Sequence, residues 1–277
     1  MEQHGTIPRK DVIAVIPARY ASVRLPGKML LSLAGTPLIV HTARQAAAAR
    51  SVSRVIVATD DDRIVRAVEA EGFDALMTSA AHRSGSDRVA EIAETLPSGT
   101  IIVNVQGDEP LISPETIDRA VEALFADGEA DIATTSEPIE SIDELFDGNV
   151  VKVTASDRGR ALYFSRSPIP FPRDPALRYG GDPGKAIRNE PEILSFFRRH
   201  TGLYVYRREY LLKFTQLPTS KLEKVEMLEQ LRALENGAWI KVVESVGRSI
   251  GVDSEEDLQR VRAIIEERES MSTVTGA

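Results

Sequence analysis

Val12-Ile13-Ala14-Val15-Ile16 is a continuous apolar run, followed at once by a loop rich in Arg, Pro and Gly. A short run of this kind is typical of a strand buried on both faces, as in a parallel sheet covered by helices. Two similar runs follow, Val55–Ala58 and Ile101–Val105, and helical patterns separate them. This alternation predicts an α/β fold with a parallel sheet, in which ligands bind beyond the carboxyl ends of the strands.

The spacing of apolar residues predicts the helices around these strands. We expect helices from about Pro37, around Ile64–Val68, over 84–96, from Ser113, and over 222–235 and 254–267. Thr36 is expected to cap the first helix, with Pro37 at its first position. Ser254 and Asp257 resemble a capping box at the start of the last helix.

The pattern changes near Asp131. Strands are expected at 150–154, 161–165 and 202–206 without long helices between them, and 167–190, rich in Pro, Gly and charge, is expected to be an extended excursion. We interpret 150–215 as an antiparallel insertion in a single domain of residues 10–267. Its outer surface is a candidate dimer interface. The ends, 1–9 and 270–277, are expected to be flexible tails.

Composition excludes several classes of function. The chain of 277 residues has 34 Lys and Arg against 42 Asp and Glu, a net charge of −8, which argues against a broad nucleic-acid surface. It has no cysteine, so disulfides, thiolate metal sites and a cysteine nucleophile are excluded. No apolar run has the roughly 18 residues that span a bilayer, and the polar start lacks the apolar centre of a secretory signal. We therefore expect a cytoplasmic protein without membrane insertion.

The loop Pro17–Lys28 carries cations at the ligand edge of the predicted sheet. Arg19, Arg24 and Lys28, with the hydroxyl of Ser22, follow the first strand directly. A triphosphate carries about four negative charges and needs fixed cations and N–H donors of this kind. A solvated basic loop is the alternative interpretation. The loop contains neither a Walker A motif nor a dinucleotide fingerprint.

Two acidic residues are candidate ligands for Mg²⁺. Asp108 follows the third apolar run, and Mg²⁺ prefers one or two carboxylates together with substrate phosphates. Asp253 precedes the last predicted helix and becomes a ligand only if it meets Asp108. The alternatives are that Asp108 caps a turn before Pro110 and that Asp253 belongs to an acidic first helical turn.

A dispersed set of side chains suits a polyhydroxylated acid. Such a substrate needs a cation for its carboxylate and several partners for its hydroxyls. Glu226 and Gln230 stand four residues apart on a predicted helix, which would make them neighbours. A surface histidine and an exposed helical glutamate are the plainer interpretations. The full set is Arg166, His200, Tyr204, Glu226 and Gln230.

Taken together, these motifs resemble those of the 3-deoxy-manno-octulosonate (Kdo) cytidylyltransferases. The resemblance runs from about Val12 to Ile265, and the first motif alone would indicate only a sugar nucleotidyltransferase. The motifs are Ile16–Lys28, Ser84–Arg88, Asn104–Pro110, Tyr163–Arg166, His200–Tyr204 and Glu226–Arg232.

The resemblance implies a nucleotide-diphospho-sugar transferase-like three-layer sandwich with a mixed, mainly parallel sheet, and a homodimer. It implies transfer of CMP from CTP to Kdo with Mg²⁺, for lipopolysaccharide biosynthesis. It places the triphosphate on Arg19, Ser22, Arg24 and Lys28, and Mg²⁺ on Asp108 and Asp253. Arg88 and Gln106 would help to bind nucleotide or sugar. The sugar would contact Arg166, His200, Tyr204, Glu226 and Gln230.

Other functions stay open from the sequence. The same fold could use another acid sugar, such as 8-amino-Kdo or a sialic-acid-like sugar. It could use UTP or GTP. A module that binds CTP without turnover is a further alternative, although the presence of Lys28, Asp108 and Asp253 argues against it.

Overall fold

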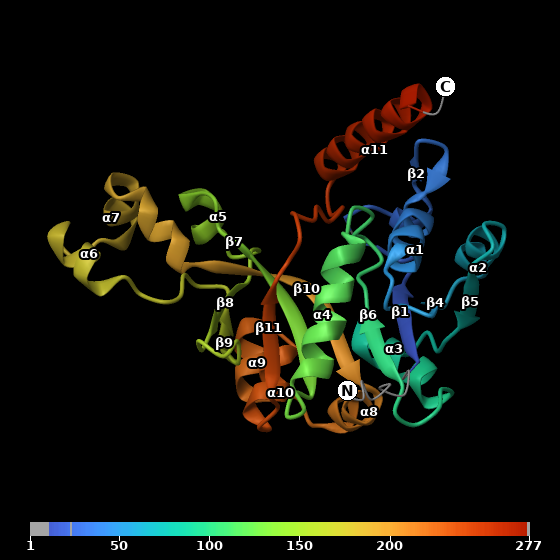
Figure 1. Ribbon diagram of the computed structural model, residues 1–277, viewed down its shortest axis with the longest axis horizontal. Coiled ribbons are helices and arrows are strands. Elements are labelled where there is room, and N and C mark those ends of the chain that lie inside the picture. The colour runs from blue at the N-terminus through green and yellow to red at the C-terminus, as the bar shows by residue number, and fades with distance from the viewer. Residues whose placement is uncertain (1–10, 23, 276–277) are drawn as a thin grey trace, which may run out of the picture. The chain divides into compact units, whose positions relative to one another are not determined.

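The computed structural model describes residues 11–22 and 24–275 (Figure 1). Its internal packing divides it into two units. The first takes in the described residues of Met1–Pro114, Tyr206–Thr215 and Ile250–Ala277, and the second takes in Glu115–Val205 and Gln216–Ser249. The single domain over 10–267 and the insertion over 150–215 stay predictions, and the expected tail 1–9 lies outside the described residues.

The first unit is built on four parallel strands. β1 (Val12–Ala18) pairs in parallel with β4 (Arg54–Thr59) and β6 (Ile101–Asn104), and β5 (Asp74–Met77) pairs with β4. The three apolar runs of the sequence are therefore strands, as predicted. Their side chains are fully enclosed, which is the burial expected of parallel strands covered on both faces.

The helices between residues 38 and 94 of this unit contact those strands, and the last helix contacts the segment Ser32–Leu33. The helices of the unit are α1 (Leu38–Ala48), α2 (Asp62–Glu69), α3 (Gly85–Glu94), α8 (Arg208–Gln216) and α11 (Glu255–Thr275), with the short η1 (Lys28–Leu30). The expected cap at Thr36 is wrong: β2 (Ser32–Leu33) pairs with β3 (Thr36–Pro37), so Thr36 is extended and α1 has no side-chain cap.

The last helix is capped as predicted. Ser254 and Asp257 exchange backbone-to-side-chain hydrogen bonds in both directions, at 2.9 and 3.2 Å. The apolar face of the helix, including Val261, is buried. The expected tail 270–277 is helical as far as Thr275, and 276–277 lie outside the described residues.

The second unit mixes parallel and antiparallel pairing. β7 (Ile132–Pro138) lies between β11 (Ile240–Glu244) and β10 (Arg198–Arg207), and β11 runs parallel to it. β8 (Lys152–Ala155) is antiparallel to both β10 and β9 (Ala161–Ser165). An α/β fold with a mixed, mainly parallel sheet is therefore confirmed. The sequence did not indicate β5 or β7.

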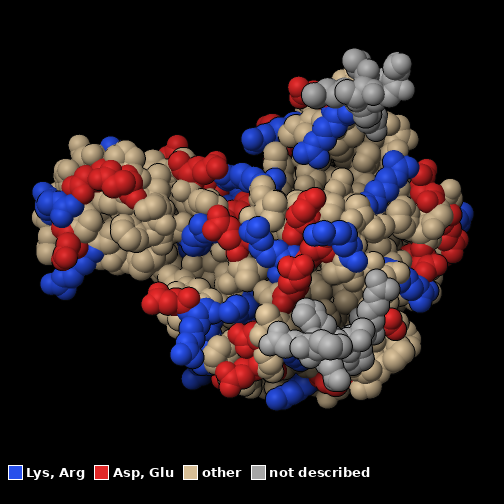
Figure 2. Space-filling model, in the orientation of Figure 1, with Lys and Arg blue, Asp and Glu red and all other residues tan. Residues whose placement is uncertain are grey.

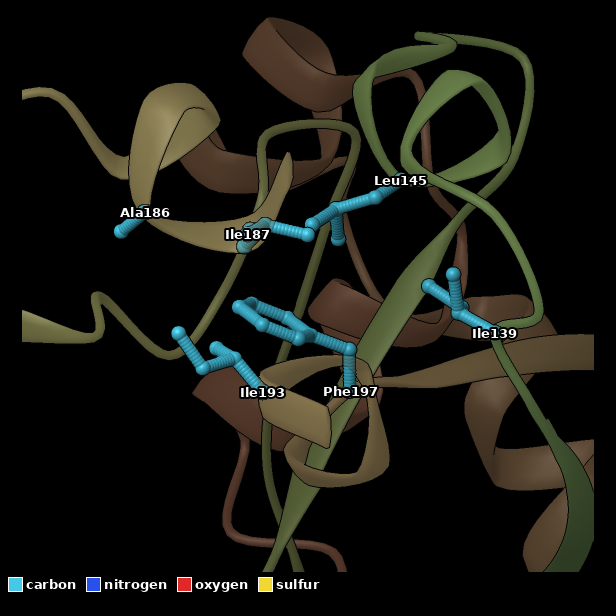
Figure 3. Packing of buried hydrophobic residues seen from close by; sticks show 6 residues of the cluster. All are labelled: Ile139, Leu145, Ala186, Ile187, Ile193 and Phe197. Atoms are coloured by element: carbon cyan, nitrogen blue, oxygen red, sulfur yellow. The ribbon is translucent and has the colours of Figure 1, made fainter. Parts of the chain in front are cut away.

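Residues 167–190 are not the extended excursion that the sequence predicts. They contain α6 (Arg173–Arg178) and α7 (Pro183–Asn189), followed by η2 (Pro191–Phe196). Asp182 caps α7 and Pro183 occupies its first position. Ile187, Ile193 and Phe197 pack with Ile139 and with Leu145 of α5 (Ile142–Phe146) in a separate small core (Figure 3). Burial of apolar side chains in that core stabilises helices in a segment whose composition suggests a loop.

The helix predicted over 222–235 is also wrong in detail. Met227 has φ 54° and ends α9 (Lys221–Glu226), and α10 (Gln230–Glu235) then starts. A methionine in the left-handed region breaks the helical hydrogen bonding, although the apolar spacing continues through it. α4 (Pro114–Ala126) begins where the sequence predicts it.

The surface mixes both signs of charge. On the face shown in Figure 2, Lys and Arg alternate with Asp and Glu instead of gathering by sign. Of the helices in the described part of the chain, none combines the length and apolar character needed to cross a membrane.

Candidate functional site

Lys28 joins three distant parts of the first unit. It lies at the start of η1, where only 7% of the residue is exposed. Its Nζ donates to Oδ2 of Asp108 at 2.7 Å and to Oδ1 of Asp253 at 3.1 Å. We call Lys28, Asp108 and Asp253 the nucleotide cluster. The two carboxylates, far apart in sequence, thus meet on one ammonium group.

The surroundings keep Lys28 charged. Burial alone lowers the pKa of its ammonium group, but the charges and hydrogen bonds of Asp108 and Asp253 outweigh burial and raise the pKa above its ordinary value. Lys28 is therefore a fixed positive charge at neutral pH.

The backbone around the cluster explains its geometry. Gly27, with φ 68°, turns the chain before Lys28 and lies against the ring of Tyr20. A Cβ on Gly107 would stand 2.9 Å from the carbonyl oxygen of Pro17, so only glycine permits this close approach next to Asp108. Val252 N donates to the carbonyl of Asp108 at 2.9 Å, which ties the segment carrying Asp253 to the turn after β6.

The two carboxylates of this cluster fit a partial Mg²⁺ shell. Their oxygens accept from the same Nζ, so they lie no further apart than those two hydrogen bonds permit. No group of three or more His, Asp or Glu side chains among the described residues could hold a metal. Mg²⁺ commonly takes one or two protein carboxylates and completes its shell with phosphate oxygens and water. The donor set is therefore suited to a metal that arrives with a phosphate.

The other residues of the first loop take different partners. Arg24 is mostly exposed and pairs with Asp253 at 3.2 Å. Arg19 donates to the carbonyls of His82 and Ser84 at 2.5 and 3.5 Å. Ser22 Oγ accepts from Leu25 N at 3.4 Å. Arg24 thus joins the cluster, whereas Arg19 fastens the loop to residues 82–84.

Arg88 is enclosed elsewhere in the first unit. Its side chain is fully buried, with Nη2 2.7 Å from Oδ2 of Asp60 and Nη1 against Thr78. Its Nε has no hydrogen-bond partner among the residues that the structure describes. Ser84 and Asp87 form a capping box that sets the start of its helix, a signal that the sequence contains as S-x-x-D. Gln106 lies partly buried, two residues before Asp108.

In the second unit, Glu226 and Arg166 lie together. Glu226 accepts from Ser165 Oγ at 2.6 Å and from Arg166 N at 2.9 Å. The guanidinium of Arg166 donates to the carbonyls of Glu226, Gly148 and Met227 at 2.7, 2.8 and 3.4 Å. The cation is therefore oriented by backbone oxygens, while the carboxylate binds the strand end beside it.

His200 and Tyr204 are neighbours on β10. Their rings are 5.2 Å apart, and the edge of Phe164 lies 5.1 Å from His200. His200 Nε2 is 2.8 Å from Thr134 Oγ1, and burial lowers the pKa of the imidazole to about 3. His200 is therefore a neutral hydrogen-bonding group at physiological pH.

The single helix expected to carry Glu226 and Gln230 is wrong. Glu226 and Gln230 were expected one turn apart on a single helix. Glu226 ends α9 and Gln230 begins α10, because Met227 interrupts the helix. Gln230 is buried. We call Arg166, His200, Tyr204, Glu226 and Gln230 the sugar cluster, as the residues that the sequence assigns to an acid sugar.

Comparisons with known proteins give a consistent picture. The family model for cytidylyltransferases matches residues 13–246. The chain is 49% identical over 257 residues to the 3-deoxy-manno-octulosonate cytidylyltransferase of Geotalea daltonii, covering 93% of this chain and 99% of that relative. It is 47% identical over 251 residues to the protein of that name from Geobacter sulfurreducens, covering 91% and 98%.

Solved structures extend the likeness to the fold. A structure of CMP:2-keto-3-deoxy-manno-octonic acid synthetase complexed with CTP matches with a TM-score of 0.82 and 39% identity, over 94% of this chain and 100% of that one. A cytidylyltransferase from Leptospira borgpetersenii matches with a TM-score of 0.59 at 17% identity, over 93% and 87%. The second likeness concerns the fold alone.

Proposed function

Because the chain belongs to the cytidylyltransferase family, we propose that it transfers CMP from CTP to the anomeric hydroxyl of Kdo and releases pyrophosphate. The nucleotide cluster is the observation that supports this most directly. One buried, charged lysine touches two carboxylates, one in the turn after β6 and one just before α11. Such a cluster offers both a cation for phosphate and ligands for a hard metal.

In this proposal the first unit binds the nucleotide. Lys28, Arg19 and Arg24 supply positive charge for the triphosphate, and Ser22 a hydroxyl. Asp108 and Asp253 would hold Mg²⁺, which neutralises phosphate charge when it is bound. Arg88 and Gln106 are the remaining residues of the proposed site. Gln106 would contact the nucleotide or the sugar. Full burial of Arg88 against Asp60 favours an indirect role, in which it fixes the residues beside the nucleotide.

The reaction asks little covalent chemistry of the protein. The anomeric hydroxyl attacks the α-phosphorus of CTP in line, the bond to the β-phosphate oxygen breaks, and pyrophosphate leaves. Positioning and charge neutralisation lower such a barrier. Lys28 suits this task, because its pKa is raised and the ammonium group stays charged. We assign no side chain as a general base.

The sugar cluster provides the groups that an acid sugar requires. Arg166 offers a guanidinium for the carboxylate, and a planar fork suits that partner. His200 is neutral and hydrogen-bonds without charge, as recognition of hydroxyls requires. Tyr204 and Gln230 add polar groups. Glu226 orients the strand end through Ser165 and Arg166.

Pyrophosphate release from CTP, measured with Kdo in the presence and absence of Mg²⁺, tests the proposal. We expect release only when CTP, Kdo and Mg²⁺ are all present. UTP, GTP, 8-amino-Kdo and a sialic acid serve as alternative substrates. A higher kcat/KM with any of them would replace the assigned substrate, and binding of CTP without release with any sugar would contradict an enzymatic role.

We further propose that the second unit associates with a second copy of the chain. Three large apolar side chains of the segment that holds α6, α7 and η2, namely Phe171, Leu177 and Phe196, have 61%, 61% and 70% of their surfaces exposed. Large apolar side chains in such numbers favour a covering partner. Light scattering should give twice the mass of one chain, and Phe196→Glu should shift it toward one. A wild-type protein with the mass of one chain would contradict the dimer.

A place in lipopolysaccharide biosynthesis, in the cytoplasm, follows from the proposed product. Depletion of the protein in its own cells should reduce Kdo in the lipopolysaccharide, and fractionation should recover the activity in the cytoplasmic fraction. Unchanged Kdo content would contradict the pathway, and activity in the membrane or extracellular fraction would contradict the location.

A further inference from the structure

Lys152 is a cation sealed inside the second unit. It lies on β8, and none of its surface is exposed. Its Nζ donates to the carbonyls of Asp147 and Val150 at 2.9 and 2.6 Å. Among the described residues, no carboxylate forms an ion pair with it. Buried lysines are rare and are normally paired, since a lone charge in the interior is costly.

Strand register places Lys152 between two parts of the sugar cluster. It is opposite Ser165 on β9 and opposite Arg199 on β10. Arg166 directly follows the end of β9, and His200 is the next residue on β10. Lys152 therefore lies on the strand that joins the two segments assigned to the acid sugar.

Lys152 and Arg166 hold the same turn. Lys152 donates to the carbonyls of Asp147 and Val150, and Arg166 Nη1 donates to the carbonyl of Gly148 at 2.8 Å. Two cations thus bind three carbonyls of four consecutive residues. Removing the Lys152 charge would free two of these carbonyls and loosen the turn that orients Arg166.

Nearby carboxylates only partly balance the two cations. Glu144 is paired with Arg199 and Arg248 at 3.2 and 2.5 Å. Asp147 is exposed and accepts from Asn149. Both oxygens of Glu226 accept from groups at the end of β9. Burial, and then the repulsion of Arg166, lower the pKa of Lys152, while the attraction of Asp147, Glu226 and Glu144 does not restore it.

We propose that Lys152 is a positioning residue for recognition of the carboxylate of the sugar. It orients Arg166 through the turn 147–150 and adds positive charge that a bound substrate carboxylate balances. The inference rests on the proposed function, because it requires an acid sugar as substrate. It predicts that Lys152 distinguishes a sugar acid from its uncharged analogue.

The test compares Kdo with its C1 carboxamide in wild type and Lys152→Met. We expect the variant to raise KM for Kdo about tenfold, the effect of one lost charge-assisted contact, with KM for CTP and kcat changed less than about threefold. Lys241→Met is the matched control, since Lys241 also donates to a backbone carbonyl, that of Arg158. This control should leave KM for Kdo unchanged.

The carboxamide separates recognition from folding. Its inhibition constant against Kdo should change less than about twofold in Lys152→Met, because it has no charge to balance. An equal loss for Kdo and the carboxamide would assign Lys152 to the fold alone, and an unchanged KM for Kdo would remove it from the site. Both outcomes overturn the inference.

If Lys152→Met unfolds, Lys152→Gln gives the same comparison, since it keeps an N–H donor to the turn without the charge. A preference for Kdo over the carboxamide as large as that of wild type in this variant also overturns the inference. The proposed function fails separately: in that case wild type releases no pyrophosphate with Kdo. Release by wild type, with equal losses in the variant, rejects only the role of Lys152.

Discussion

The nucleotide cluster and the sugar cluster satisfy their charges differently. In the nucleotide cluster, Lys28 is held by the carboxylates of Asp108 and Asp253. In the sugar cluster, Arg166 is held by backbone carbonyls, and the Glu226 carboxylate by a hydroxyl and an amide. The first cluster balances most of its charge internally. In the second, no carboxylate of the described residues is bonded to the guanidinium of Arg166.

This difference suits two kinds of ligand. Two carboxylates with one ammonium can accept a divalent cation and the phosphates that come with it. A guanidinium fixed by carbonyls keeps its charge for a single carboxylate and is oriented beforehand, which reduces the entropy lost on binding. Substitutions in the first cluster should therefore change kcat most, and those in the second should change KM for the sugar.

Asp108→Ala should give the largest effect. We expect kcat to fall on the order of 10²-fold or more, because a charge-stabilising position is lost. Steady-state pyrophosphate release measures this. Asp61→Ala is the control, since Asp61 caps α2 and pairs with Arg63, so its loss should cost about 1 kcal/mol of stability without changing kcat. A near-normal rate for Asp108→Ala would remove the metal role.

Lys28→Ala should lower kcat by about 10²-fold and leave the protein folded. The positive charge of the Lys28 ammonium group, which the raised pKa maintains, would no longer stabilise the transferred phosphate. Circular dichroism and a melting curve provide the control. A collapse of the melting temperature, with kcat retained at low temperature, would identify Lys28 as structural.

Glu226→Gln tests the sugar cluster. The amide accepts less strongly from Ser165 Oγ and Arg166 N, so we expect KM for Kdo to rise about tenfold. KM for CTP should change less than about twofold. A fall in kcat with KM for Kdo unchanged would mean that the two clusters do not divide the work as proposed.

The prediction for His200 concerns stability instead of turnover. Its folded pKa of about 3 lies below the ordinary value of 6.5, so the unfolded chain binds the extra proton between these limits. The contribution of neutral His200 to the free energy of unfolding is complete above pH 6.5. It is lost as pH falls toward 3, by at most about 1.4 kcal/mol per pH unit. In His200→Gln, urea unfolding at pH 7.5 and 4.5 should differ less than in wild type. An equal difference would show that His200 does not carry this dependence.

The sequence was informative where a structural element depends on residues that are close together in the chain. The apolar runs beginning at Val12, Val55 and Ile101 become parallel strands, and polar residues follow each one. The capping pair Ser254 and Asp257 forms as predicted, because both partners belong to one helical turn. Interactions within a few residues depend little on the remainder of the chain.

The sequence was less informative where distant segments compete with local pattern. Apolar spacing continues through Met227, yet the helix breaks there and separates Glu226 from Gln230. The helices in 167–190 form against the small core around Phe197, which includes Ile139 and Leu145 from another part of the chain. Full burial of Lys152 depends on pairing with two other strands, so its own segment gives no sign of it.

The sequence by itself determined the α/β class, the positions of three parallel strands along the chain, and the candidate residues of both clusters, since apolar periodicity and short motifs are local properties. Only the tertiary structure decided which partners those residues take. It set Lys28 between Asp108 and Asp253, enclosed Arg88 beside Asp60, and fixed Arg166 on backbone carbonyls. The physical reason is that ion pairs and burial depend on distances in space, which long-range strand pairing and packing establish.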